Sequence, residues 1–410
     1  MRVLWLTGVP SRYSSRGSAY NGCGWVSSLE SEMASRVELG LAFVLNGEQG
    51  KTVRNGVTYY PVNNPFNAGR AGRLFKLIAG HSLERALLLS AYGRIIDDFK
   101  PDVIQVFGTE HVYGLTVRET DVPSVIHIQG VLNAYLEHFL PDDMILQDYF
   151  MSGKTAAGIF GKIYSYIDVK RRARVEAKIM ASARNFIGRT DWDRAQAARY
   201  NRNAAYYHVD EVLREPFYKA SGTWKRPDSD VLVTTISEAP YKGMDVVLRT
   251  AAILKNRYGR NFRWLVFGNV NVPFFEEFTG ITCESCGVEP AGVADAAKIA
   301  SVLASASVYV HPSYNENSPN SLCEAQIVGT PVVASDIGGI PSLVEDSVTG
   351  MLAKAGDPVD FAAKIQSVLS SGKFAESLSA QEVRTALSRH DKASIVNDLL
   401  NVYRSISGKY

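Results

Sequence analysis

Both halves of this 410-residue chain alternate short, strongly apolar runs with stretches of helical periodicity. Apolar runs of this length are typical of buried strands, and their alternation with helices is typical of a parallel sheet covered on both faces. The runs fall at 3–6, 40–45, 103–106, 124–128 and 185–187, and again at 231–236, 264–267, 308–310 and 331–334. This pattern predicts an α/β fold with two doubly wound domains in series.

The expected domain boundary lies near Arg214-Glu215-Pro216, because the following residues 222–229 are rich in Gly, Pro and polar side chains. We therefore expect a first domain over 1–215, a second over 216–390, and an appended segment over 391–410 with an amphipathic helix at 393–406. Two open sheets in series leave a cleft at the carboxyl ends of their strands, where ligands bind in such folds.

Composition excludes several classes of protein. The net charge of +2 argues against nucleic acid as a partner. The first apolar run is too short for a signal peptide, and about 18 consecutive apolar residues occur nowhere, so we expect a cytoplasmic protein. Cys283-x-x-Cys286 has no second cysteine pair to complete a four-ligand metal site, so plain thiols are expected.

Basic residues are concentrated between Lys162 and Arg189. This segment has eight of them and only two acidic residues, Asp168 and Glu176. Two interpretations stay open for this basic cluster. It is either a solvated helix face or a peripheral docking surface for an anionic membrane, on whose inner face a lipid-linked acceptor would lie.

The strongest motif runs from His311 to Pro341. A buried strand ends at Val310, a polar loop carries Glu316, and Ser318-Pro319 then reads as the N-cap and first residue of a helix. The next amides, at Asn320 and Ser321, would stay free at the positive end of the helix dipole. Such an end is a ready site for a diphosphate.

Two glutamates eight residues apart flank this helix start. Glu324 lies one to two turns inside the helix, where its carboxylate could accept hydrogen bonds from both hydroxyls of a ribose, and Glu316 can reach toward a sugar. A charged loop followed by a surface helix would explain the glutamates alone. The full succession of strand, Glu, capped helix, Glu, Gly329-Thr-Pro and second strand favours a functional site.

This succession, with Gly338-Gly339-Ile-Pro341 after it, resembles the signature of the family-four group of retaining GT-B glycosyltransferases. The resemblance implies two Rossmann-like domains facing across a cleft, with a final helix that crosses back to the first domain. It also implies that Glu316 contacts the donor sugar and that Glu324 binds the nucleotide ribose.

A second match is Lys242-Gly243, directly after a strand-like run. In the family this lysine neutralises the donor diphosphate, so Lys242 is expected to stabilise the leaving group. The family often has an arginine five residues earlier, where this chain has Ser237. Either Lys242 carries more of the phosphate charge, or another basic residue substitutes.

The first half matches more weakly. Gly22-Cys-Gly24 resembles the glycine-rich loop of the family, although Gly-x-Gly is as often a simple tight turn. His127 ends a buried strand where the family has a histidine facing the reacting sugar, yet a lone histidine there is more often structural. Asp191-Trp-Asp193 spells a metal-binding motif of another glycosyltransferase fold, but it suits a helix N-terminus and we expect no metal here.

The resemblance thus implies a retaining, metal-independent transferase without a cofactor, moving a sugar from a nucleotide-sugar donor to a glycan or lipid-linked acceptor in a surface-polysaccharide pathway. Two alternatives remain, a non-catalytic sugar-nucleotide-binding subunit and a GT-B nucleotide-sugar epimerase or hydrolase. The expected catalytic residues are Glu316, Lys242 and His127. The expected donor-binding residues are Glu324, Ser318, Asn320, Ser321, Gly22, Gly24, Ser237 and Asn317.

Overall fold

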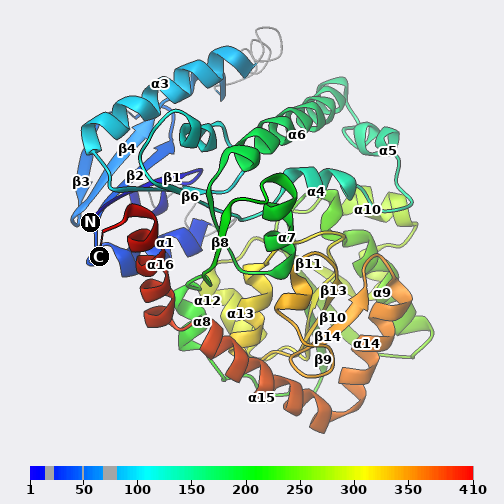
Figure 1. Ribbon diagram of the computed structural model, residues 1–410. Helices are drawn as coiled ribbons and strands as arrows, with labels where there is room; N and C mark the ends of the chain where they lie inside the picture. Colours follow the sequence, from blue (N-terminus) through cyan, green and yellow to red (C-terminus); the bar gives the residue numbers. More distant parts are fainter. Residues whose placement is uncertain (14–22, 49, 68–80, 410) are drawn as a thin grey trace.

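The computed structural model describes residues 1–13, 23–48, 50–67 and 81–409, which form two α/β domains, each built on its own sheet (Figure 1). The strand order of the first sheet is β3-β4-β2-β1-β5-β6-β7-β8, with only β3 antiparallel to its neighbour. Its strands are β1 (Arg2–Thr7), β2 (Glu38–Val44), β3 (Thr52–Arg54), β4 (Val57–Val62), β5 (Val103–Phe107), β6 (Ser124–His127), β7 (Asn185–Gly188) and β8 (Ala205–His208).

Helices cover both faces of the first sheet, as the buried strands require. Val3, Leu4, Trp5 and Leu6 of β1 are all fully buried, so side chains pointing to either face enter a core. The described helices of this domain are α1 (Cys23–Met33), α3 (His81–Phe99), α4 (Leu132–Glu137), α5 (Leu146–Met151), α6 (Ala156–Ser182) and α7 (Asp191–Tyr200), with short 3-10 turns η1 (Ser11–Tyr13), η2 (Pro65–Asn67) and η3 (Val112–Arg118).

The second sheet is wholly parallel and has the order β11-β10-β9-β12-β13-β14. Its strands are β9 (Asp230–Thr235), β10 (Phe262–Phe267), β11 (Val288–Gly292), β12 (Val308–His311), β13 (Val332–Asp336) and β14 (Met351–Lys354). Its helices and 3-10 turns are α8 (Glu215–Lys219), η4 (Pro240–Lys242), α9 (Met244–Asn256), α10 (Val272–Thr279), α11 (Cys283–Cys286), α12 (Ala296–Leu303), α13 (Asn320–Val328), η5 (Ile340–Ser342), α14 (Pro358–Ser370) and α15 (Gly372–Arg389), and α16 (Lys392–Ser407) follows them at the end of the chain. The expected α/β fold with two doubly wound sheets is confirmed.

The chain passes between the two domains twice, and the two crossings lie against each other. Val212 packs in the core of the first domain, whereas Leu213 and Phe217 pack in the core of the second. The return crossing follows α15 at His390, whose Nδ1 lies 2.8 Å from the carbonyl oxygen of Glu211. The crossings therefore form one buried joint.

After the return crossing, α16 lies on the first domain beside α1 (Figure 1). Its apolar side chains share a core with β1, β2 and β5. Tyr403 is fully buried there, where the indole Nε1 of Trp5 donates to its hydroxyl at 3.0 Å and the hydroxyl donates to Gln105. The last helix thus contributes to the core of the domain that begins the chain.

The basic cluster of the first domain is split by the fold. Arg189 is only 4% exposed and faces the second domain, so it is no part of a surface. Lys170, Arg174 and Lys178 are exposed on successive turns of α6. No helix among the described residues is long and apolar enough to cross a bilayer.

We expect Tyr403→Ala to destabilise the first domain by about 3–5 kcal/mol, because it removes a fully buried aromatic ring. Urea denaturation of the variant would measure the loss. Asn401→Ala is a matched control because Asn401 is exposed on the same helix, and it should change stability by less than about 0.5 kcal/mol. Equal effects of the two substitutions would contradict the packing described for α16.

Candidate functional site

A cavity of about 420 Å³ lies between the two domains, at the carboxyl ends of strands from both sheets. Cavities at this edge of open α/β sheets are the usual place for ligands. Its charged lining consists of three cations and three carboxylates, namely Arg189, Arg214, Lys242, Glu211, Glu316 and Glu324. Each cation pairs with one carboxylate of this set.

Glu316 and Lys242 form the first pair. Glu316 follows β12 and is 5% exposed, and its Oε1 accepts a hydrogen bond from the ammonium of Lys242. The same oxygen lies 3.3 Å from His311 Nε2 and 3.2 Å from Ser313 Oγ. Burial disfavours the carboxylate, but the Lys242 charge and the hydrogen bonds prevail and lower the pKa of Glu316 to about 2. The site therefore holds Glu316 ionised.

A tight turn after β9 positions Lys242. The 3-10 turn η4 ends at Lys242, and Gly243 follows with φ 80°, where a Cβ would lie 2.2 Å from the carbonyl oxygen of Pro312. Only glycine fits this close approach of the two loops. Burial opposes the charge of Lys242, but Glu316 outweighs it and raises the pKa of the ammonium. The structure thus brings Lys242 and Glu316, both expected site residues, into direct contact.

Glu324 and Arg214 form the second pair. Glu324 lies inside α13 and is 3% exposed, and its two oxygens each accept a guanidinium hydrogen bond from Arg214 at 2.7 Å. Arg214 crosses the start of α1, where a Cβ on Gly24 would lie 2.4 Å from its Cδ. The glycine predicted from the loop motif thus makes room for an arginine that reaches the second domain.

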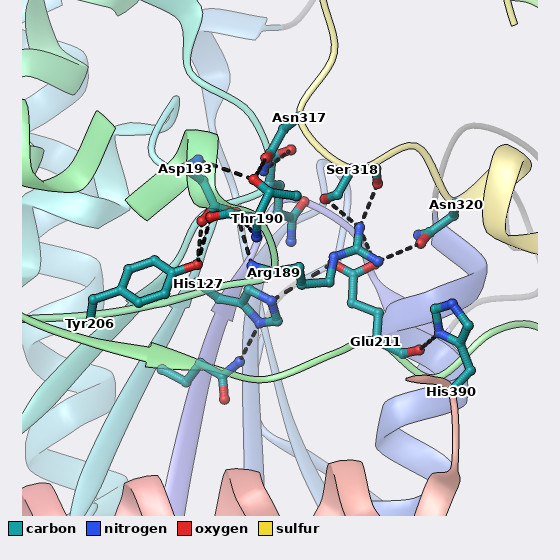
Figure 2. A network of polar contacts seen from close by, with 12 residues as sticks. His127, Arg189, Thr190, Asp193, Tyr206, Glu211, Asn317, Ser318, Asn320 and His390 are labelled. Atoms are coloured by element: carbon teal, nitrogen blue, oxygen red, sulfur yellow. Dashed lines mark hydrogen bonds and ion pairs between the residues drawn. The ribbon is translucent and has the colours of Figure 1, made fainter. Parts of the chain in front are cut away.

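Arg189 and Glu211 form the third pair (Figure 2). Arg189 follows β7, and its Nη2 lies 3.1 Å from Glu211 Oε2. The same nitrogen donates to the carbonyl oxygen of Ser318 at 2.5 Å and to its hydroxyl at 2.6 Å, and Nη1 donates to Asn320 Oδ1 at 3.0 Å. A guanidinium of the first domain is therefore held at the start of α13 in the second.

The start of α13 differs in detail from the expectation. The N-cap is Pro319 and makes no side-chain cap hydrogen bond, so the prediction that Ser318 caps the helix and Pro319 is its first residue was wrong. The hydroxyl of Ser318 accepts from Arg189 instead of from a helix amide. The first amides of a helix have no acceptor within it, and Asn320 and Ser321, the first two residues of α13, line the cavity.

His127 lies behind the cavity and is not one of its lining residues. Its ring is 1% exposed, with Nδ1 3.2 Å from Gln105 Nε2 and Nε2 3.7 Å from Glu211 Oε1 (Figure 2). Burial, with the nearby Arg189 charge, lowers the pKa of His127 to about 3. The imidazole is therefore neutral, and its expected role beside the sugar stays a prediction.

The remaining predicted residues divide into three groups. Ser237 and Gly24 line the cavity together with Glu316, Lys242, Glu324, Ser318, Asn320 and Ser321. Asn317 does not, because its amide oxygen accepts from the hydroxyl of Thr190 at 2.9 Å across the domain interface. Gly22 lies outside the described residues.

The Asp191-x-Asp193 segment forms the N-terminus of α7, as expected, and Thr190 is the N-cap. Asp193 is fully buried, and its Oδ2 accepts from the Arg189 amide at 2.9 Å, while Tyr206 donates to its Oδ1. Thr190 and Asp193 form a reciprocal capping box at this N-terminus. Among the described residues, no three His, Cys, Asp or Glu side chains group as metal ligands would.

Arg214 and Glu211 were not predicted. Arg189 was counted in the basic cluster, although its segment, residues 188–194, also resembles a segment that the family has near the cleft. All three follow strands of the first sheet, and such positions face the cleft in a doubly wound fold. That position in the chain was the available signal. Their partners in α13, however, are more than one hundred residues away along the chain.

The Glu316 pair predicts a defined acid sensitivity. The pKa of Glu316 falls from its usual 4.5 to about 2 on folding, so its stabilising contribution is complete above pH 4.5 and is lost as the pH drops through 2. In urea denaturation, the stability difference between wild type and Glu316→Gln should therefore shrink by roughly 3 kcal/mol over this window. A difference that stays constant would contradict the pairing; exposed Glu376→Gln is the control.

The sequence of this chain is similar to that of known glycosyltransferases. Residues 230–371 match the family model described as Glycosyl transferases group 1. D-inositol 3-phosphate glycosyltransferase of Thermobifida fusca is 27% identical over 317 residues, covering 68% of this chain and 73% of that protein. The enzyme of the same name from Geodermatophilus obscurus is 48% identical over 64 residues, which cover 16% of this chain and 14% of that protein.

Solved structures match over nearly the whole chain. Sucrose-phosphate synthase from Thermosynechococcus elongatus superposes with a TM-score of 0.74 at 15% identity, covering 100% of both chains. HepE of Anabaena in complex with UDP and glucose gives a TM-score of 0.67 at 15% identity, covering 99% of this chain and 100% of that one. At such identities the likeness concerns the fold, which is that of the GT-B glycosyltransferases. Residues 230–371 thus match the glycosyl transferases group 1, and the chain has the GT-B fold.

Proposed function

We propose that this protein is a retaining, metal-independent glycosyltransferase that moves a sugar from a nucleotide-diphosphate sugar to a glycan or lipid-linked acceptor. The observation that carries the proposal is the meeting of Lys242, Glu316, Glu324 and the start of α13 around one cavity. These groups come from two strand-loop-helix units of the second domain, the part of the chain that matches the family model.

Each group has a chemical task in such a transfer. The free amides of α13 and the ammonium of Lys242 offer positive charge to a diphosphate, and Lys242 stabilises the charge that develops as the diphosphate departs. The carboxylate of Glu324 suits the hydroxyls of a ribose. In the solved HepE complexes the bound molecules are UDP, UDP with glucose, and UDP-glucose, which supports a nucleotide-sugar donor.

Within a retaining transfer, the state of the carboxylates favours reaction on one face of the sugar over a covalent intermediate. A covalent intermediate needs a free carboxylate beneath the anomeric carbon. The three carboxylates that line the described cavity, Glu211, Glu316 and Glu324, are each held by a cation. A transfer on one face of the sugar needs none of them as nucleophile, because the departing phosphate oxygen accepts the proton of the acceptor hydroxyl. The protein then acts by positioning and by charge stabilisation.

The donor is tested by calorimetry with UDP-, GDP- and ADP-sugars in EDTA. We expect one of them to bind wild type without metal, and Glu324→Gln to weaken that binding roughly 10- to 100-fold through the lost charged acceptor. Exposed Glu376→Gln on α15 is the matched control and should bind as wild type does. Binding by none of the nucleotides, or binding only with added metal, would contradict the proposal.

A surface on α5 and α6 supports a membrane-bound acceptor. Ile145, Met151 and Phe160 are 61%, 56% and 53% exposed. Phe160 lies five helical turns before Lys178 on α6, so exposed apolar and basic side chains share one side of this helix. An apolar edge beside cations fits an anionic bilayer surface, where each basic residue contributes about 1 kcal/mol. We include peripheral contact with such a membrane in the proposed function.

Vesicle sedimentation tests this contact. The protein should co-sediment with vesicles containing phosphatidylglycerol but not with phosphatidylcholine alone, and the triple variant Lys170→Gln/Arg174→Gln/Lys178→Gln should lose about 3 kcal/mol of binding free energy. The control triple Lys225→Gln/Arg257→Gln/Lys373→Gln removes exposed charges from the second domain. If both triples lose binding equally, or wild type does not distinguish the vesicles, α6 is a solvated face.

A further inference from the structure

Ser237 places no positive charge in the proposed donor site. It lines the cavity at the position where the resembled family often has an arginine, and its hydroxyl carries no charge. A diphosphate brings about two negative charges, whereas the ammonium of Lys242 is shared with Glu316. Burying such an anion without a second cation would be costly. The chain therefore needs another positive group near the start of α13.

Two arginines line the described cavity besides Lys242, and their positions differ. Arg214 donates from Nε and Nη2 to the two carboxylate oxygens of Glu324. Glu324 lies inside α13, where the ribose is expected. Arg189 reaches Asn320, the first residue of the helix, and Ser318, which lies two residues before it. Arg189 is therefore the cation that lies where a diphosphate on the helix amides would be.

The surroundings of Arg189 suit the binding of an anion. A cation beside a helix N-terminus faces the positive end of the dipole, an unfavourable arrangement that an anion between them reverses. Arg189 is 4% exposed and lines the cavity, and its Nε is buried without a hydrogen-bond partner among the described residues. Buried guanidinium nitrogens are normally hydrogen-bonded. Among the residues that the structure describes, Glu211 is the one charged side chain within ion-pair distance of Arg189.

We propose that Arg189 binds the diphosphate of the donor and supplies the second cation that Ser237 does not. This inference rests on the proposed function of the same cavity. Because Arg189 belongs to the first domain and α13 to the second, the diphosphate is then held from both domains at once. The donor thereby joins the two domains, and Glu211 keeps the guanidinium in place before the donor arrives.

Nucleotide titrations of two variants test the role of Arg189. The probes are UDP, GDP and ADP by calorimetry and the matching nucleosides by saturation-transfer NMR. Arg189→Gln should weaken the preferred nucleoside diphosphate roughly 10- to 100-fold and leave the nucleoside within about twofold, because the loss concerns the phosphates. Exposed Arg199→Gln on the neighbouring α7 is the matched control and should bind as wild type does.

The double variant Arg189→Gln/Glu211→Gln separates charge binding from charge neutralisation. It leaves no unpaired buried carboxylate, so it also covers the case in which the single variant fails to fold. We expect the double variant to retain the loss for the diphosphate. Restored diphosphate affinity in the double variant, or an equal loss for the nucleoside, would overturn the proposal. Binding of none of the three diphosphates by wild type would instead overturn the function on which it rests.

Discussion

Three ion pairs, each with a buried carboxylate, determine how this molecule is put together around its cleft. A buried charge costs several kcal/mol unless a partner compensates it. Arg189 pairs with Glu211, Arg214 with Glu324, and Lys242 with Glu316. Two of the pairs involve arginines that reach from the first domain or its connection to α13 of the second. The charges of the six side chains that line the cavity therefore cancel. Each cation is held in a fixed position by its carboxylate, where it can also interact with a bound anion.

The same pairs relate the site to the domain joint. Glu211 lies one residue before the crossing at Val212 and Leu213, and its carbonyl oxygen contacts His390 of the return crossing. From there, α16 continues to Tyr403, which donates to Gln105, and Gln105 contacts His127 beneath Glu211. A series of contacting side chains thus connects the proposed donor site with the joint between the domains. Enclosure of the donor there would exclude water and favour transfer over hydrolysis.

Much of the second domain could be predicted from sequence because its signals are local. Glu316, Glu324 and Lys242 lie in loops and turns between a buried strand and a helix, where spacing along the chain determines spacing in the fold. The short strands β3, β4, β8, β11 and β14 were not predicted. β3, β8, β11 and β14 lie at sheet edges, where exposure weakens the apolar pattern, and β4 contains Pro61.

Other parts of the site depend on contacts that no local pattern contains. Arg189 was counted in the basic cluster, but it is buried, with Glu211 of its own domain and Ser318 and Asn320 of the second domain as partners. Ser318 was predicted to be a helix cap, but its hydroxyl accepts a hydrogen bond from the guanidinium of Arg189 in the other domain. His127 ends the expected strand, yet the packing of Glu211 in front of it places it behind the cavity. In each case a long-range partner decided the role.

The most direct test of the account is a crystal structure of the chain with its preferred nucleoside diphosphate, grown in EDTA. We predict phosphate density at the amides of Asn320 and Ser321, within hydrogen-bond distance of Lys242 and Arg189, and a ribose on Glu324. Density for the nucleotide elsewhere on the molecule, or phosphates at α13 that contact neither cation, would contradict the central claim that this cleft holds a donor diphosphate by its own charges.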